Sequence, residues 1–176
     1  CVLLCGAGYR GDEPEVTLLQ SLGVPVVIPH GEPGDFKTTG FAVFYSDTRQ
    51  IWRDGLAYLA QQGFRHVGAL GLLRHGKESW RSGSAAEHLQ QLAELGLAPI
   101  APIAPEFDDI AAFDCALGAY LAEHSQIEAL LCHSDFVALK VYHYCRQHKI
   151  RIPQDLAVMG ICGYPGGSLL SPALST

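Results

Sequence analysis

Short apolar runs alternate with amphipathic segments along the 176-residue chain, and glycine, proline or polar residues separate them. Apolar runs of this length predict buried strands, whereas apolar residues that recur at helical spacing predict helices. The strands are predicted at residues 2–5, 24–28, 41–45, 66–73, 129–132 and 156–160. The helices are predicted at residues 12–22, 48–62, 80–95, 110–124 and 136–148. Strands that alternate with helices favour an α/β protein with a doubly wound parallel sheet.

Residues 129–160 carry the clearest of these patterns: a strand, a turn, a helix and a second strand. Ser134 or Asp135 in the turn can cap the helix by accepting hydrogen bonds from N–H groups that lack a helical partner. The packed face of the helix is predicted to consist of Phe136, Leu139, Tyr142 or His143, and Cys145 or Arg146. Pro153 prevents the helix from continuing. Since a crossover of this length joins parallel strands, the segment is predicted to be a βαβ unit.

Two stretches rich in glycine or proline are predicted to lack regular structure. Residues 30–40 are interpreted as a loop between two strands. Residues 100–105 lie among three prolines and are at best an irregular or edge strand, because proline cannot donate to a sheet. A further polar loop is predicted at residues 74–79.

The composition is that of a globular protein, with 48% hydrophobic and 17% charged residues. The formal net charge is −6, and no cluster of Lys and Arg supplies the counterion release that duplex binding needs. This segment is therefore not expected to hold nucleic acid by itself. No run reaches membrane-spanning length, and no secretion signal is visible. Because the chain starts in mid-strand without Met, we expect it to be a piece of a longer protein.

The six cysteines form no Cys-x-x-Cys pair and no pattern of a disulfide-rich scaffold. Three of them lie in apolar, strand-like runs. We expect these three to be buried thiols in a reducing cytoplasm.

The segment Ser134-Asp135-Phe136-Val137-Ala138-Leu139, with Ile-Pro-Gln-Asp-Leu-Ala-Val-Met-Gly at residues 152–160, resembles the effector-binding core of the lactose-repressor/galactose-repressor family of transcription regulators. That family has an Asn-Asp-x-x-Ala-Leu turn, a helix, and a Val-Pro-x-Asp strand that ends in glycine. Further segments are similar to the family in the same order, at residues 24–28, 43–47, 59–67 and 171–176. The resemblance covers nearly the whole chain.

The resemblance implies a periplasmic-binding-protein-like I fold with two lobes. Residues 1–46 would be part of an incomplete N-terminal lobe, and residues 47–176 would be the C-terminal lobe, ending at the return crossover between lobes. It implies a cytoplasmic homodimer that binds a small-molecule effector in the cleft between its lobes. Operator DNA would be bound by a helix-turn-helix headpiece that is absent from this chain. No enzymatic activity, cofactor, metal or membrane is implied.

Six effector-binding residues follow from the resemblance: Asp47, Arg81, Phe107, Ser134, Asp135 and Cys162. The guanidinium of Arg81 could donate paired hydrogen bonds to sugar hydroxyls or to a carboxylate. Alternatively, Arg81 could be an exposed residue in the first turn of a helix. Phe107 could stack on a ligand ring or fold onto the core. Asp135 could accept ligand hydroxyls or only cap its helix. Asp47 would lie where the chain crosses between the lobes.

Two of these positions depart from the family pattern. Cys162 stands where the family has a ligand-contacting aspartate, and Ser134 stands where it often has asparagine. A thiol is a weak donor and acceptor and cannot hold two hydroxyls as a carboxylate does. We therefore expect an effector that is less rich in hydroxyls, or more anionic, than a neutral monosaccharide.

Two other classes of protein remain open. One is a solute-binding protein of a transporter, which would carry a secretion signal in the full gene product. The other is a dinucleotide-dependent enzyme that uses Gly6-Ala7-Gly8-Tyr9-Arg10-Gly11, because this loop follows a predicted strand and Glu32 comes about twenty residues later. Acidic residues at the start of the next helix oppose this reading, since they would repel a pyrophosphate. The sequence has no Gly-x-Ser-x-Gly elbow, P-loop lysine or zinc-ligand spacing, so catalysis is not favoured.

Overall fold

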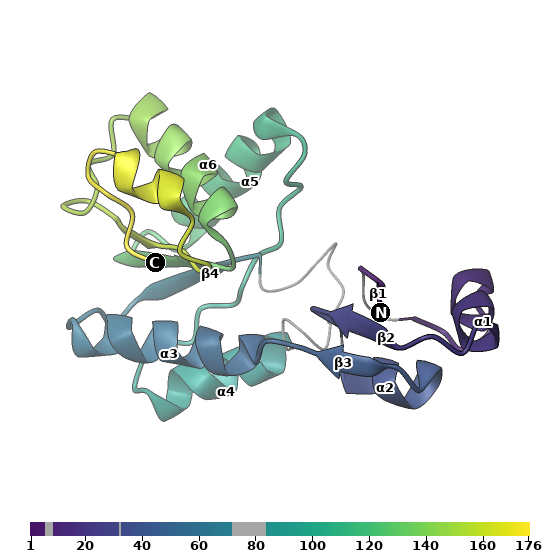
Figure 1. The fold of residues 1–176 in the computed structure, drawn as a ribbon. Coiled ribbons are helices and arrows are strands. Elements are labelled where there is room, and N and C mark those ends of the chain that lie inside the picture. Colours follow the sequence, from purple (N-terminus) through teal and green to yellow (C-terminus); the bar gives the residue numbers. More distant parts are fainter. Residues whose placement is uncertain (6–8, 32, 72–83) are drawn as a thin grey trace. The chain divides into compact units, whose positions relative to one another are not determined.

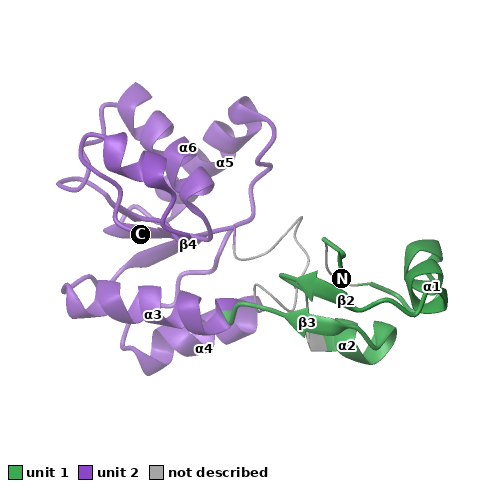
Figure 2. Cartoon of the chain, viewed as in Figure 1, with its two compact units in different colours: residues 1–47 green, residues 48–176 purple. Residues whose placement is uncertain are grey.

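The computed structural model describes residues 1–5, 9–31, 33–71 and 84–176. Figure 1 shows the helices and strands of the chain. They divide into two compact units, Cys1–Asp47 and Thr48–Thr176, which Figure 2 colours separately and which we call unit 1 and unit 2.

Unit 1 is a three-stranded parallel sheet with two connecting helices. The strands β1 (Val2–Leu3), β2 (Val26–Pro29) and β3 (Ala42–Phe44) pair in the order of the sequence. Helix α1 (Pro14–Ser21) connects β1 to β2, and α2 (Pro33–Thr39) connects β2 to β3. The small core of this unit contains four buried side chains: Val16, Val26, Ile28 and Phe41.

Helix α2 contradicts the prediction of a loop over residues 30–40. Tertiary contacts override the low helix propensity of this segment. The side chain of Asp35 is buried and accepts a hydrogen bond from the N–H of Tyr9 at 2.8 Å. The hydroxyl of Thr39 donates to the carbonyl of Asp35 at 2.6 Å. The helix ends at Gly40, whose φ of 72° few other residues adopt.

Unit 2 contains a second parallel sheet, with strands β4 (Val67–Leu70), β5 (Ala129–Cys132) and β6 (Ala157–Met159) in that order. The predicted parallel pairing of these strands is confirmed. Single parallel bridges extend both edges of the sheet: Ile103 pairs with Leu70, and Ser175 pairs with Met159. The stretch between residues 100 and 105 is thus an irregular edge, as predicted.

Helices cover both faces of this sheet, because alternate strand residues point to opposite sides. Helices α3 (Thr48–Gln61) and α4 (Ala85–Glu94) lie on one face, and α5 (Ile110–Glu123) and α6 (Asp135–Gln147) lie on the other (Figure 1). The strand residues that face α3 and α4 are Val67, Ala69, Ala129, Leu131 and Ala157. Those that face α5 and α6 are Leu70, Leu130, Cys132 and Val158.

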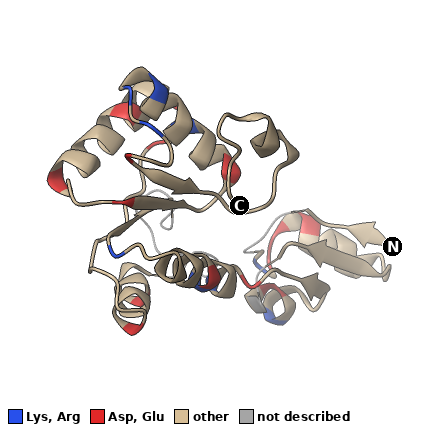
Figure 3. Cartoon of the chain, turned by 90° about the vertical axis from the view of Figure 1, so that its left-hand side faces the viewer, with Lys and Arg blue, Asp and Glu red and all other residues tan. Residues whose placement is uncertain are grey.

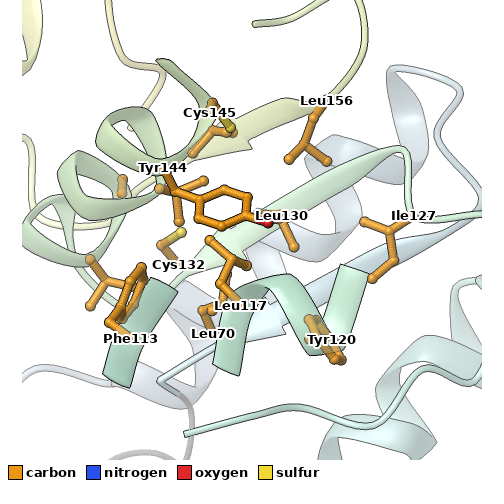
Figure 4. Close-up of a cluster of buried hydrophobic side chains, with 14 of the residues drawn as sticks. Leu70, Phe113, Leu117, Tyr120, Ile127, Leu130, Cys132, Tyr144, Cys145 and Leu156 are labelled. Atoms are coloured by element: carbon orange, nitrogen blue, oxygen red, sulfur yellow. The ribbon is translucent and has the colours of Figure 1, made fainter. Parts of the chain in front are cut away.

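The larger core lies between the sheet and helices α5 and α6 (Figure 4). Within it, the hydroxyl of Tyr120 donates to the carbonyl of Ala101 at 2.9 Å and accepts from the N–H of Ala69 at 3.2 Å. Burial raises the pKa of Tyr120 to about 12, so the phenol keeps its proton and both hydrogen bonds. These bonds hold α5 against the first strand of the sheet.

Helix α6 presents a different face to the core from the one predicted. Its buried apolar residues are Val137, Ala138, Val141, Tyr144 and Cys145. Phe136, predicted to lie on the packed face, is 66% exposed. The buried side chain of Asp135 holds the first turn of the helix against the loop after β6, and this fixes the rotation of the helix about its axis.

Helix α4 (Ala85–Glu94) begins after Ser84, and residues 80–83 of the predicted helix lie outside the described residues. Ser84 caps it in a reciprocal pair of hydrogen bonds with Glu87. The hydroxyl of Ser84 accepts from the N–H of Glu87 at 3.1 Å, and the N–H of Ser84 donates to Glu87 Oε2 at 2.8 Å. This cap requires an extended backbone at Ser84, so the helix cannot include Ser84 and starts at the next residue.

The buried thiols are Cys132 in β5 and Cys145 in α6, whereas Cys5 and Cys162 are exposed. The prediction that cysteines in apolar runs are buried therefore holds for Cys132 and is wrong for Cys5. Burial raises the pKa of Cys145 to about 11 and raises that of Cys132 as well. Across the described ranges, none of the helices has the length and apolar character needed to cross a bilayer.

A buried histidine links the two helices on the α3 and α4 face. His88 of α4 is 1% exposed, and Trp52 of α3 donates its indole N–H to His88 Nδ1 at 3.2 Å. Burial lowers the pKa of His88 to about 4, because the charged imidazolium would lose its hydration. Nδ1 can accept this hydrogen bond only while the ring is neutral, so protonation would break the link between the helices.

We expect the free energy of unfolding to fall as the pH drops from 6.5 towards 4, with His88 responsible for about 3 kcal/mol of the loss. The pKa of His88 is lower in the folded chain than in the unfolded chain, so acid protonates and favours the unfolded state. Urea denaturation across this pH range measures the effect. His88→Leu should flatten the pH dependence, and His148→Gln, at an exposed position, should leave it unchanged. An unaltered slope in His88→Leu would contradict the assignment.

Candidate functional site

The loops that follow β4, β5 and β6 meet at one edge of the unit 2 sheet. We call this the carboxyl edge and define it by Gly71, residues 133–136 and residues 160–164. Open α/β sheets bind ligands at the carboxyl ends of their parallel strands. Three of the residues that the sequence nominated lie there: Ser134, Asp135 and Cys162.

Asp135 is the most firmly held side chain at the carboxyl edge. It is the first residue of α6 and is 1% exposed. Its carboxylate accepts a hydrogen bond from the N–H of Tyr164 and another, of 2.7 Å, from the hydroxyl of Thr176. The N–H of Asp135 donates to the carbonyl of Ile161 at 2.9 Å. Asp135 therefore ties the start of α6 to the loop after β6 and to the segment at residues 171–176.

Gly160 makes room for this carboxylate, because a Cβ at that position would overlap Asp135 Oδ1. The same two segments also pair directly through their backbones. The N–H of Gly160 donates to the carbonyl of Ser175 at 2.8 Å, and the N–H of Gly163 donates to the hydroxyl of Thr176 at 3.1 Å. The loop after β6 is thus held from two sides, by the Asp135 carboxylate and by residues 175 and 176.

Ser134 is the residue that caps α6. Its backbone is extended, and its hydroxyl accepts from the N–H of Val137 at 3.4 Å. The cap leaves the carboxylate of Asp135 to the loop contacts, which settles the choice between the two capping residues. Ser134 is partly exposed beside this buried carboxylate.

Cys162 lies exposed in the loop after β6, with a φ of 108° that residues other than glycine seldom adopt. Partial burial and the negative charge of Asp135 raise the pKa of its thiol. The thiol therefore stays protonated at neutral pH and offers a ligand only weak hydrogen bonding.

Phe107 packs beside the loop after β5. Its ring centroid lies 5.5 Å from that of His133 and 6.1 Å from that of Phe113 in α5. Gly71, with a φ of 78°, leaves space for the imidazole of His133, because a Cβ at Gly71 would overlap that ring. Phe107 is half-buried against the larger core. Its ring thus contacts both the core and a residue of the carboxyl edge.

The carboxyl edge also carries an exposed aromatic pair that the sequence did not reveal. Phe136 is 66% exposed and Tyr164 is 50% exposed. Their ring centroids lie 5.7 Å apart, with an angle of 37° between the planes. The helical pattern had assigned Phe136 to the packed face of α6. Tyr164 lies in a glycine- and proline-rich segment without periodicity, so no signal in the sequence indicated its position.

Two nominated site residues are not part of this edge as the structure describes it. Asp47 is the exposed last residue of unit 1. Arg81 lies outside the described residues, as do Gly6, Ala7, Gly8 and Glu32 of the proposed dinucleotide fingerprint.

The described part of that fingerprint has contacts within unit 1. A Cβ at Gly11 would press on the carbonyl of Thr38 in α2, so this glycine permits close packing of two backbones. Arg10 pairs with Asp12 at 2.8 Å. Helix α1 begins at Pro14, after the last glycine of the motif rather than within it. These contacts do not favour dinucleotide binding.

Charged side chains are scattered over the helices of both units, and Figure 3 shows no basic stripe in the described parts of the chain. Two exposed ion pairs join α3 to α4, between Arg49 and Glu87 at 3.0 Å and between Arg53 and Glu94 at 2.7 Å. In the portion of the chain that the structure describes, no group of three His, Cys, Asp or Glu residues could hold a metal ion.

A hollow of about 280 Å³ lies beside β6, and neither Phe136 nor Tyr164 lines it. Its lining includes Tyr58 of α3, Gln62 directly after that helix, Tyr142 of α6, Pro153 and Pro172. None of the nominated site residues that the structure describes lines this hollow.

The family model of the periplasmic binding protein-like domain matches residues 56–176, which is most of the chain. The chain belongs to this family. The match includes β4, β5 and β6 and the whole carboxyl edge, so it covers the sheet of unit 2 and the candidate site.

Transcriptional regulators share this periplasmic-binding-protein-like fold. A PurR-family regulator from Vibrio parahaemolyticus RIMD 2210633 gives a TM-score of 0.78 at 21% identity, over 98% of this chain and 63% of that one. A LacI-family regulator from Arthrobacter sp. FB24, in complex with lactose, gives 0.71 at 27% identity, over 96% and 59%. The ribose operon repressor of Haemophilus influenzae is 41% identical over 56 residues, which are 32% of this chain and 17% of the repressor. The chain therefore spans less than two thirds of the length of these relatives.

These matches confirm the resemblance to effector-binding cores of the lactose-repressor type, and they confirm the fold class. The relatives are regulators of transcription rather than enzymes. The assignment of residues 1–46 and 47–176 to the two lobes stays a prediction, and so do the six effector contacts.

We expect Asp135→Asn to lower the free energy of unfolding by about 1–3 kcal/mol, because one buried donor would then face an amide NH₂ instead of an oxygen. Urea denaturation monitored by circular dichroism measures this loss. Asp155→Asn is the matched control, since Asp155 pairs with Arg151 on the surface and its change should have a much smaller effect. Equal stabilities of the two variants would show that the Asp135 carboxylate does not hold the loop.

Proposed function

We propose that this chain is part of the small-molecule sensing domain of a DNA-binding transcriptional regulator. Effector binding at the carboxyl edge would shift the population of conformers and so change operator binding by a helix-turn-helix headpiece outside this chain. The match of residues 56–176 to the periplasmic-binding-protein-like family, with regulators among the relatives, is the observation that carries this proposal.

The proposed effector is a sugar or a related metabolite. The lactose complex of the Arthrobacter relative supports this class. At the carboxyl edge, Ser134 would supply a hydroxyl and Phe107 a partly exposed ring, while Arg81 would supply donors from outside the described residues. Because Cys162 offers no carboxylate, we propose an effector that is less rich in hydroxyls, or more anionic, than a neutral monosaccharide.

The remaining features of the proposal follow from the family. The full protein would be a cytoplasmic homodimer without enzymatic activity. Asp47 would lie at the crossover between lobes, and Asp135 would act on the effector by holding the loop that carries Cys162 rather than through a free carboxylate oxygen. A solute-binding protein of a transporter is the alternative, and it would lack any effect on DNA.

We expect the full-length protein to bind one member of a panel of sugars, sugar phosphates and nucleosides in calorimetric titration. The same compound should change the affinity for operator DNA in fluorescence anisotropy.

Arg81→Ala should weaken binding of the effector, because a charged hydrogen-bond donor is lost. Cys162→Asp should shift selectivity towards neutral hexoses, since it restores a carboxylate acceptor.

Two results would contradict the proposal in different ways. Tight binding of a neutral hexose that survives Arg81→Ala would show that the pocket and its chemistry are wrong. Binding of a sugar with no effect on DNA would instead favour the solute-binding alternative.

A further inference from the structure

Phe136 and Tyr164 form an exposed aromatic pair that does not take part in the core of unit 2. Neither ring belongs to the two clusters that pack against the sheet. Large aromatic side chains are usually buried, and their exposure together at one place is a mark of a binding surface. The two rings contact each other, with centroids 5.7 Å apart, and both residues are exposed to solvent over half or more of their surface.

The pair belongs to the same two loops as the nominated polar contacts. Phe136 follows Ser134 by two residues in the first turn of α6, and Tyr164 follows Cys162 by two residues in the loop after β6. The rings therefore belong to the two segments that carry Ser134 and Cys162 on the carboxyl edge.

The backbone on which Tyr164 sits is held in place before any ligand binds. Its N–H donates to the buried carboxylate of Asp135, and its carbonyl accepts from the N–H of Gly167 at 2.9 Å. Gly166 leaves space for the ring, because a Cβ there would stand 2.5 Å from the Tyr164 ring. Phe136 is held by the capped first turn of α6. Because the backbone at both positions is already fixed, a ligand that stacks on the rings need not order these two segments.

The geometry points to a stacking subsite: we propose that Phe136 and Tyr164 take the apolar C–H face of a sugar ring of the effector. The inference rests on the proposed function and adds the chemistry by which the ring is recognised. An aromatic face binds the C–H side of a sugar without using its hydroxyls. The subsite therefore supplies affinity where Cys162 has replaced the carboxylate that would bind hydroxyl groups. Because the rings contact each other, a sugar ring would stack on the solvent-exposed faces of the pair.

Titration of the full-length protein with lactose, glucose 6-phosphate and ribose 5-phosphate tests the subsite. Phe136→Ala and Tyr164→Ala should each weaken binding of whichever sugar the parent binds by roughly two- to tenfold, the range of a lost aromatic contact. Tyr58→Ala is the matched control, since Tyr58 is a similarly exposed aromatic, at 47%, near the end of α3. It should leave the affinity unchanged. All three side chains are exposed, so the variants should keep the melting temperature of the parent.

A fluorescent variant gives a direct readout of ring contact. Phe136→Trp places an exposed indole in the subsite, and binding of the sugar should shift its emission. Unchanged affinity in both alanine variants, together with an indole that does not respond, would overturn the subsite and leave the sensing function standing.

Two further outcomes would also overturn the inference. If none of the three sugars binds to the parent protein, the sugar-sensing function fails and the subsite fails with it. If the alanine variants change the oligomeric state in sedimentation and leave sugar affinity intact, the pair is a protein interface rather than a sugar subsite.

Discussion

The buried carboxylate of Asp135 is the contact on which the arrangement of the carboxyl edge depends. Removing a carboxylate from water costs several kcal/mol unless hydrogen bonds replace the lost hydration. Here the replacements come from the N–H of Tyr164 and the hydroxyl of Thr176, so three segments far apart in the sequence must meet at one point. Glycine is the only residue that fits at position 160, because a Cβ there would overlap Asp135 Oδ1. A polar constraint of this kind fixes loop positions more narrowly than apolar packing alone, because hydrogen bonds depend on direction as well as on contact.

The constraint shapes what the edge offers to a ligand. The loop after β6 carries Cys162 at a strained backbone angle and then Tyr164, and both positions follow from the way Asp135 holds that loop. The same carboxylate sets the rotation of α6, which buries Val137 and turns Phe136 outward. The edge therefore combines one hydroxyl, one neutral thiol and exposed rings. Within the part of the site that the structure describes, these groups offer a ligand ring faces and neutral polar groups rather than a free charge.

Much of the fold could be predicted from the sequence. The βαβ unit from β5 to β6 followed from the apolar runs, the capped turn and Pro153, because these signals are local. Helix α2 could not be predicted, since Asp35 and Thr39 stabilise it through contacts with Tyr9 and with the turn of the helix itself. The packed face of α6 was also wrong, because a buried acidic residue at its start outweighs the apolar pattern that follows. At the candidate site, the family motif nominated Asp135 and Cys162 as effector contacts. The hydrogen-bond partners of Asp135 and the contact of Phe136 with Tyr164 could not be predicted, because they depend on tertiary contacts that residue spacing does not encode.

Hydrogen exchange of the full-length protein, with and without its effector, tests most directly whether the carboxyl edge of unit 2 is the place of binding. Ligand contact there should slow exchange of backbone amides at residues 134–138 and 160–164, because the bound molecule excludes water and restricts opening of these segments. The amides around Glu128, at the opposite end of β5, should exchange at their original rates. Protection confined to the amides of Ile152, Ala173 and Ser175, which line the hollow beside β6, would contradict the assignment of the site.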